Sequence, residues 1–264
     1  MGPRGKWILS DRWKRRPTVA IPRTLTLNGS KTGEPLHLLI TVLLITDYFR
    51  PQRPRQIITQ KLAKPPLLRH NSTMPATPST MVELGRQASD FHLPSVADGR
   101  MVSLADFASN QGLLVMFICR HCPYVLHVKP ELARLASDYI GKSIGVIGIS
   151  SNDAQHYPDD APEKLIELSR DLDIPVLYDE SQAVAKAYQA ACTPDFFLFD
   201  EKRRLVYRGQ LDDSRPGNNR PLTGRDLRSA IDAVLSGKPI ATEQRASIGC
   251  NIKWKPGNEP DYFR

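Results

Sequence analysis

The stretch around which this sequence is organised is Leu113–Tyr124, which reads Leu-Leu-Val-Met-Phe-Ile-Cys-Arg-His-Cys-Pro-Tyr. Its apolar part, residues 113–118, is rich in branched and aromatic side chains, as in a strand buried on both faces of a sheet. Pro123 favours the first turn of a helix, where its missing N–H costs no hydrogen bond. The sequence therefore predicts a buried strand that runs directly into a helix, with Cys119 and Cys122 at the junction.

The two cysteines at this junction are expected to form a redox-active dithiol. A helix begins with unpaired N–H groups and with the positive end of its dipole, and both stabilise a thiolate. The pKa of such a cysteine falls below the free value of about 8.5. We expect Cys119 to be the nucleophile and Cys122 to resolve the mixed disulfide, with positive charge on Arg120 and His121 favouring the thiolate. Two cysteines at this spacing can also close a disulfide reversibly.

A Cys-x-x-Cys pair can also be one half of a structural metal site. No second pair of this kind and no close pair of histidines completes four ligands in this sequence. We therefore expect no metal and no organic cofactor. The carboxylates of Asp159–Asp160 and Asp212–Asp213 lack the spacing of a metal-binding loop and are interpreted as solvated.

Two further cysteines are candidate accessory thiols. Cys192 comes two residues before Pro194 and is interpreted first as a buried, inert side chain, because free cysteine packs as a small apolar residue. Cys250 lies in a C-terminal segment without periodicity. It is either a distant resolving cysteine or a packing residue of a tail that docks on the body of the protein.

The character of the chain changes near residue 81. Residues 1–80 carry fourteen Lys and Arg against three Asp and Glu, whereas the rest carries twenty-two against twenty-five. We expect a basic, proline-rich, disordered leader over 1–80, a folded domain over 81–240, and an irregular tail over 241–264 that docks on the domain. Because the folded part is mildly acidic, the high overall pI gives no reason to expect a nucleic-acid partner.

One apolar island interrupts the leader. Leu36–Thr46 is eleven residues long, whereas a membrane-spanning helix needs roughly 20 apolar residues. We therefore expect no membrane span and a cytoplasmic protein. Organellar targeting remains an alternative, because the leader is basic and poor in acidic residues.

The pattern downstream of the leader alternates strands and helices. We expect a hairpin around Asp98–Gly99, helices over 123–139, 162–172, 181–191 and 223–235, and strands over 143–150, 176–178, 196–199 and 205–208. This order predicts an α/β fold with a central mixed sheet covered by helices on both faces. Ligand chemistry in such sheets collects at the carboxyl ends of strands, where the two cysteines stand.

Residues 81–264, about two-thirds of the chain, resemble the thioredoxin superfamily, and within it the redoxin or peroxiredoxin-like branch. The matching segments are Leu84-Gly85 with Asp90-Phe91 and Leu93-Pro94, Phe117-x-Cys119-x-x-Cys122, Tyr178-Asp179 with Ala187-Tyr188, and Thr193-Pro194 before Phe196–Asp200. The resemblance implies a thioredoxin-like fold with an N-terminal hairpin extension. It also implies a cis Pro194 that, with Thr193, forms a substrate-binding platform against the dithiol.

The sequence also departs from both parts of that superfamily. Ile118 stands where thioredoxins carry Trp, Arg120-His121 stands where they carry Gly-Pro, and the peroxide-site Pro and Thr or Ser of peroxiredoxins are missing. We therefore expect an oxidoreductase for thiol–disulfide exchange, with protein or small-molecule disulfides and thiols as substrates and an external thiol as reductant. The alternatives are a thiol peroxidase that reduces hydroperoxides through a sulfenic acid, and a non-catalytic redox-sensing module.

Overall fold

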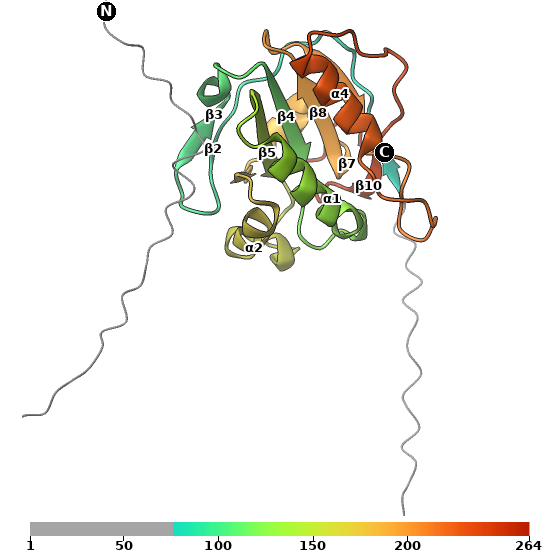
Figure 1. Cartoon of the computed structure of the whole chain (residues 1–264). Helices are drawn as coiled ribbons and strands as arrows, with labels where there is room; N and C mark the ends of the chain where they lie inside the picture. Colours follow the sequence, from blue (N-terminus) through green and yellow to red (C-terminus); the bar gives the residue numbers. More distant parts are fainter. Residues whose placement is uncertain (1–75, 264) are drawn as a thin grey trace, which may run out of the picture. The chain divides into compact units, whose positions relative to one another are not determined.

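A five-stranded mixed sheet forms the centre of the computed structural model, which describes residues 76–263 (Figure 1). The strand order is β6 (Val176–Tyr178), β5 (Ile144–Ser150), β4 (Gly112–Phe117), β8 (Asp195–Phe199) and β9 (Leu205–Gly209). The pairs β4–β5 and β5–β6 are parallel, and β4–β8 and β8–β9 are antiparallel. The predicted central mixed sheet is confirmed.

Strand β4 is buried on both faces because its side chains alternate between two apolar clusters. Leu114 and Met116 pack on one face with side chains of α1 (Pro123–Tyr139), α2 (Pro162–Leu172) and α4 (Arg225–Leu235), the helices drawn in front of the sheet in Figure 1. Its other face packs against the hairpin of β2 (His92–Pro94) and β3 (Met101–Ser103), and against α3 (Ala183–Tyr188). The expected cover of helices on both faces and the expected N-terminal hairpin are thus present.

Three short strands form a second sheet in the order β1 (Thr77–Pro78), β10 (Ile248–Asn251) and β7 (Cys192–Thr193). Two expectations are corrected here. The tail after residue 240 is not irregular throughout, because β10 pairs on both of its edges. The folded part also begins before residue 81, because β1 supplies one of those partners. The rest of the expected leader, residues 1–75, lies outside the described residues.

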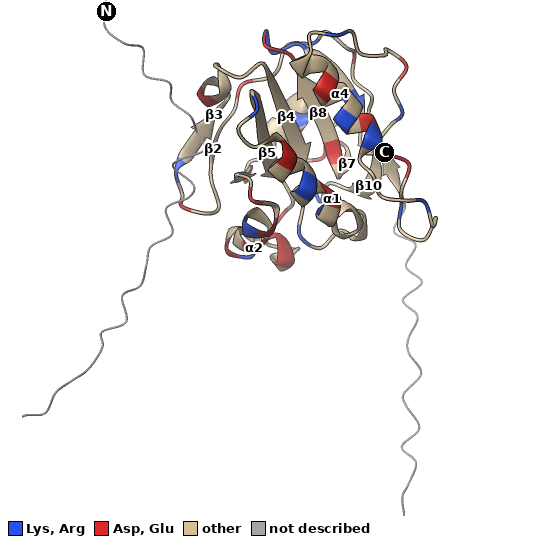
Figure 2. Cartoon of the chain, viewed as in Figure 1, with Lys and Arg blue, Asp and Glu red and all other residues tan. Residues whose placement is uncertain are grey.

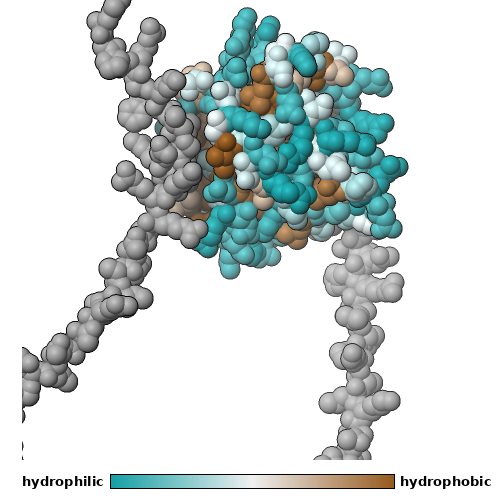
Figure 3. Space-filling view, viewed as in Figure 1, coloured by the Kyte–Doolittle hydropathy of each residue, from teal (hydrophilic) through white to brown (hydrophobic). Residues whose placement is uncertain are grey.

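The surface of the described residues is mixed in charge. Lys and Arg alternate with Asp and Glu along the helices of the face drawn in Figure 2. Apolar side chains lie scattered among hydrophilic ones on the same face (Figure 3). Among residues 76–263, no helix is long and apolar enough to cross a membrane.

Candidate active site

The two cysteines lie at the junction of β4 and α1, as the sequence predicts. Cys119 follows the last residues of β4, and Cys122 is the N-cap residue of α1, with Pro123 in the first helical turn. Both cysteines are free thiols, and their exposed fractions are 1% and 0%. The dithiol is therefore formed by the strand-to-helix connection but is closed off from solvent.

Both sulfur atoms face Thr193. The Cys119 Sγ lies 3.2 Å from the Thr193 Oγ1, and the Cys122 Sγ donates to the Thr193 carbonyl oxygen at 3.1 Å. The peptide bond between Thr193 and Pro194 is cis. The structure thus brings together the four residues that the sequence singled out as dithiol and platform.

Arg120 and His121, in contrast, do not act on Cys119 as expected. The Arg120 guanidinium binds Glu167 at 2.8 Å, and its backbone N–H donates to Asp160 at 2.7 Å. The His121 Nδ1 lies 2.6 Å from the other carboxylate oxygen of Asp160. Because both cations face carboxylates, the expectation that they lower the pKa of Cys119 is wrong.

The electrostatic environment instead favours negative charge on Cys122. Burial raises the pKa of the Cys119 thiol, and the neighbouring Cys122 and the Asp160 carboxylate raise it further. The pKa of Cys122 is lowered, first by the thiol of Cys119, then by the thiol of Cys250, and also by the backbone amide of Val125. Burial raises the pKa of Cys122, and the Thr193 carbonyl accepts from its thiol, but the groups that lower the pKa outweigh both effects.

Asp160 is a site residue that the sequence analysis missed. It was expected to be solvated, but its side chain is fully buried and accepts hydrogen bonds from the Arg120 N–H and the Asn152 Nδ2, each at 2.7 Å. Burial raises the pKa of Asp160, but the bonds from His121 and Asn152 outweigh burial and lower it. Asp160 also raises the pKa of His121. No spacing in the sequence signals a carboxylate forty residues beyond the dithiol.

Asp212 is a second carboxylate that was wrongly expected to be solvated. It is fully buried and accepts the N–H groups of Thr223 and Gly224 at 2.6 Å each. These amides precede α4, so Asp212 stabilises the start of that helix. Its role is structural.

Cys119, His121 and Asp160 present ligand atoms that lie within 4.8 Å of one another. These residue types can hold a metal ion. However, the 2.6 Å between His121 Nδ1 and Asp160 Oδ2 is shorter than the roughly 3.3 Å between two ligands of a tetrahedral zinc ion. As placed, this group is an ion pair beside a thiol.

The two accessory thiols differ in their surroundings. Cys192 is fully buried, its Sγ points to the Pro194 carbonyl at 3.5 Å, and burial raises its pKa. Cys250 is 2% exposed, lies opposite Thr193 in the pairing of β10 with β7, and has its pKa raised first by the neighbouring Cys122 thiol. Cys250 is thus the accessory thiol that interacts more strongly with Cys122.

Asp195 follows the cis proline and begins β8. Its side chain is fully buried, and its Oδ2 accepts the Ala191 N–H at 3.3 Å. Burial raises the pKa of this carboxyl to about 7, against the hydrogen bonds that lower it. A titratable group is therefore buried directly after Pro194, at the start of β8.

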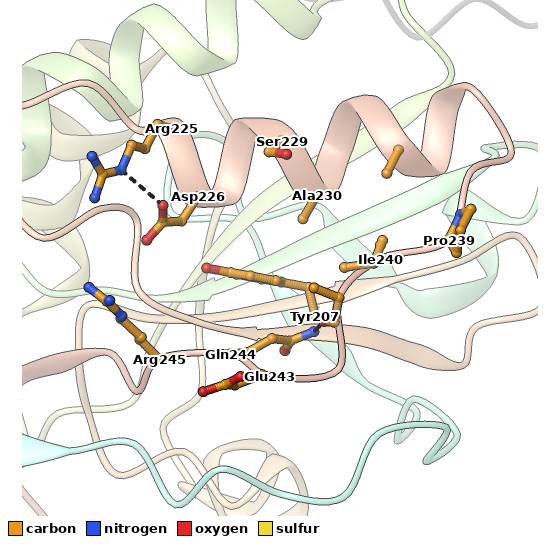
Figure 4. Close-up of a pocket in the computed structure, with 12 residues that line it drawn as sticks. Tyr207, Arg225, Asp226, Ser229, Ala230, Pro239, Ile240, Glu243, Gln244 and Arg245 are labelled. Atoms are coloured by element: carbon orange, nitrogen blue, oxygen red, sulfur yellow. Dashed lines mark hydrogen bonds and ion pairs between the residues drawn. The ribbon is translucent and has the colours of Figure 1, made fainter.

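A surface pocket lies elsewhere, between α4 and the segment that follows it (Figure 4). Its wall includes Tyr207, Asp226 and Arg245. The neighbouring residues Arg225 and Asp226 form an ion pair at one end of it. None of its lining residues is a cysteine or belongs to the Thr193–Pro194 platform. The dithiol does not open into this pocket.

Comparison with known proteins gives one family and several solved structures. The Redoxin family profile matches residues 83–226. An uncharacterized conserved protein from Geobacillus kaustophilus is 54% identical, with a TM-score of 0.68, over 69% of this chain and 98% of that one. The hypothetical protein SMc02350 from Sinorhizobium meliloti 1021 is 50% identical, with a TM-score of 0.66, over 68% and 98%. No curated protein matches the sequence.

Proposed function

Because the chain belongs to the redoxin family of the thioredoxin superfamily, we propose that it catalyses thiol–disulfide exchange through Cys119 and Cys122. Family membership supports a thiol redox function. The observation that carries the finer proposal is the convergence of both sulfur atoms on Thr193, at 3.2 Å and 3.1 Å, beside the cis peptide bond. Two thiols held against one residue are placed to form a disulfide with each other as a substrate disulfide is reduced.

In the proposed reaction, Cys122 attacks first. Its pKa is the lowered one of the pair, and the thiolate is the nucleophile in exchange. The Cys122 thiolate attacks one sulfur of a substrate disulfide, the substrate S–S bond breaks, and the departing substrate thiolate takes up a proton. Cys119 then loses its proton and attacks the Cys122 sulfur of the mixed disulfide. The second substrate thiol leaves, and the Cys119–Cys122 disulfide forms.

The cycle closes through an external thiol reductant. Two exchanges with that thiol return both cysteines to the reduced state and release its disulfide, so that two electrons pass from the reductant to the substrate. No metal and no organic cofactor takes part in these steps. The proposed order of attack, Cys122 before Cys119, is the reverse of the order expected from sequence. The lowered pKa of Cys122 and the carboxylates that face Arg120 and His121 support it.

Single serine variants test this function and its order of attack. We expect Cys122→Ser to reduce insulin-type disulfide reduction to the uncatalysed level and to form no mixed disulfide with substrate. We expect the double variant Cys119→Ser, Cys250→Ser to lose turnover but to accumulate a mixed disulfide on Cys122, detected by mass spectrometry. Cys192→Ser is the matched control with unchanged turnover, because it replaces a buried cysteine outside the dithiol.

Two results would change the assignment. A mixed disulfide that accumulates on Cys119 in Cys122→Ser would restore Cys119 as the nucleophile. Peroxide consumption that survives Cys119→Ser, is lost in Cys122→Ser and exceeds disulfide reduction would identify a thiol peroxidase. Equal inactivity of wild type and variants in both assays would contradict an enzymatic role and favour a redox-sensing module.

A further inference from the structure

The edge of β7 that carries Thr193 is already occupied by the chain's own β10. The two strands pair antiparallel, with Cys250 opposite Thr193 and Asn251 opposite Cys192. This is the arrangement in which an extended peptide adds to the exposed edge of a sheet, with main-chain hydrogen bonds for affinity and one side chain in a pocket. Here the side chain that faces the dithiol is itself a thiol.

The approach of β10 is close along its length. A Cβ on Gly249 would overlap the carbonyl of Thr193, so that only glycine fits there with the strands in this position. The Ser247 hydroxyl donates to the Pro194 carbonyl at 2.6 Å. The strand is therefore positioned by backbone contact, which leaves the Cys250 side chain little freedom.

The Cys250 sulfur meets Cys122 and the start of α1. The proximity of the Cys122 thiol raises the pKa of Cys250, and the backbone amide of Tyr124 lowers it. Strand β10 also packs against α1, the helix that Cys122 caps. Cys119 also lies beside Cys122, because the Sγ atoms of both contact Thr193, at 3.2 Å and 3.1 Å. The three cysteines belong to one buried cluster, and Cys250 lies opposite Thr193, whose carbonyl faces the Cys122 Sγ. Cys122 is thus the sulfur that both other thiols can attack.

We propose that β10 is an internal substrate strand and that Cys250 forms a reversible disulfide with Cys122. This proposal rests on the function proposed above, because the Cys122–Cys250 disulfide arises from the disulfides of that reaction. Cys250 acts there as a second resolving thiol. When Cys122 carries a mixed disulfide, Cys250 loses its proton and attacks the Cys122 sulfur. The substrate thiolate leaves and takes up that proton, and the Cys122–Cys250 bond forms.

The same bond can arise from the oxidised dithiol. The Cys250 thiolate attacks Cys122 in the Cys119–Cys122 disulfide, that S–S bond breaks, and Cys119 leaves as the thiolate and is protonated. One disulfide is lost and one is formed, so this step needs no oxidant or reductant. In the Cys122–Cys250 state, β10 is covalently fixed over the dithiol and Cys119 is again a thiol.

Disulfide mapping of the full chain tests the proposal without any protein substrate. The reduced protein is treated with glutathione disulfide, remaining thiols are blocked with N-ethylmaleimide at acid pH, and peptides are identified by mass spectrometry. We expect wild type to contain both Cys119–Cys122 and Cys122–Cys250. We expect Cys119→Ser to contain Cys122–Cys250 in the majority of molecules, and Cys250→Ser to contain Cys119–Cys122 alone.

The control is Cys119→Ser, Cys192→Ser, which retains the proposed pair and should give the same bond. Absence of a Cys122–Cys250 peptide in wild type and in Cys119→Ser, both folded by circular dichroism, overturns the proposal. A Cys122–Cys192 bond in its place does the same. If Cys119→Ser does not fold, the wild-type protein decides. A Cys122–Cys250 peptide supports the proposal, and its absence overturns it. Failure of the proposed function would appear separately, as absent turnover in a protein that still forms Cys122–Cys250.

Discussion

The protonation state of the buried Asp195 carboxyl affects the stability of the folded protein. Its pKa rises from 3.8 to about 7 in the folded protein because burial disfavours the charged form. It pairs with Phe117 across β8 and β4, next to the dithiol strand. Ionisation of Asp195 therefore places a charge in the least solvated part of the sheet.

The sign of the resulting pH dependence follows from the raised pKa. The stabilising effect of the protonated carboxyl is complete below about pH 4 and is lost as the pH rises to about 7, where the folded group ionises. Three pKa units correspond to roughly 4 kcal/mol of unfolding free energy as an upper figure. We expect Asp195→Asn to remove this decline, measured by urea unfolding of wild type and variant from pH 4 to pH 8.

The difference in unfolding free energy between wild type and Asp195→Asn isolates the contribution of Asp195. Carboxylates with lowered pKa values, such as Asp160, contribute the opposite slope to both proteins and cancel in the difference. Glu83→Gln, a change at an exposed position, is the control that should run parallel to wild type. A wild-type curve parallel to that of Asp195→Asn would contradict the prediction.

At the residue scale, the sequence predicted those site residues that belong to short local motifs. Cys119, Cys122 and the cis Pro194 were found because a strand end, a helix start and a family motif are local patterns. Asp160 was missed because its burial depends on the position of a one-turn 3-10 helix, Pro158–Asp160, against the dithiol loop. The charges of Arg120 and His121 were visible, but their carboxylate partners were not.

The pairing of β10 is the feature that distinguishes this site at the level of secondary structure. The strand is central in its small sheet, with β1 on one edge and β7 on the other. It also packs against α1, the helix that Cys122 caps. Access to the dithiol therefore depends on β10 as much as on the helix start.

Gly249→Ala tests that dependence. The added methyl group would meet the Thr193 backbone, which cannot move aside as a flexible side chain could. We expect a loss of about 1–3 kcal/mol or more in unfolding free energy, the usual cost of overpacking. We also expect faster alkylation of Cys122 by iodoacetamide, because β10 must shift from its position over the dithiol.

The matched control is Gly257→Ala in the same tail. Gly257 has a φ of +78° and nothing within 4 Å of an added Cβ, so the change carries backbone strain without overlap. We expect a cost of about 1 kcal/mol there and no change in the alkylation rate of Cys122. Equal alkylation rates in the two variants would argue against β10 as a cover.

The elements that were predicted well are the long periodic ones. The strand β4 and the helix α1 match their predicted ranges to within one residue, because a buried run and a 3.6-residue period are strong signals. The strands β1 and β10 have two and four residues, too few for any period to emerge. Their pairing is set by tertiary contacts, which propensity does not describe.

For the molecule as a whole, the described part starts upstream of the expected domain boundary. The Ser79 N–H donates to the Ser247 carbonyl at 2.8 Å, and the Thr80 hydroxyl donates to the Gln189 carbonyl at 2.8 Å. Residues near position 80 thus contact the segments that lead into β10 and β7. We propose that the part of the chain needed for folding and exchange begins between Met74 and Thr77.

Two truncated chains test this boundary. A chain that starts at Met74 keeps β1, and we expect its unfolding free energy and its exchange rate to equal those of the full chain. A chain that starts at Met81 loses β1 and these hydrogen bonds, each of which contributes about 1 kcal/mol. We expect it to unfold at lower urea concentration. Equal urea midpoints for the two truncated chains would place the boundary at Met81 after all.

The position of β10 in the chain has a consequence for biosynthesis. Every other element of the site precedes Ile248 in the sequence, and a nascent chain leaves the ribosome from its N-terminus onward. During synthesis, β4, α1 and the cis-proline loop can therefore assemble while Cys119 and Cys122 are still uncovered. In that interval the nascent protein carries an open dithiol, which it encloses only when the last strand arrives. Thiol labelling of ribosome-bound chains of increasing length would record the moment of closure.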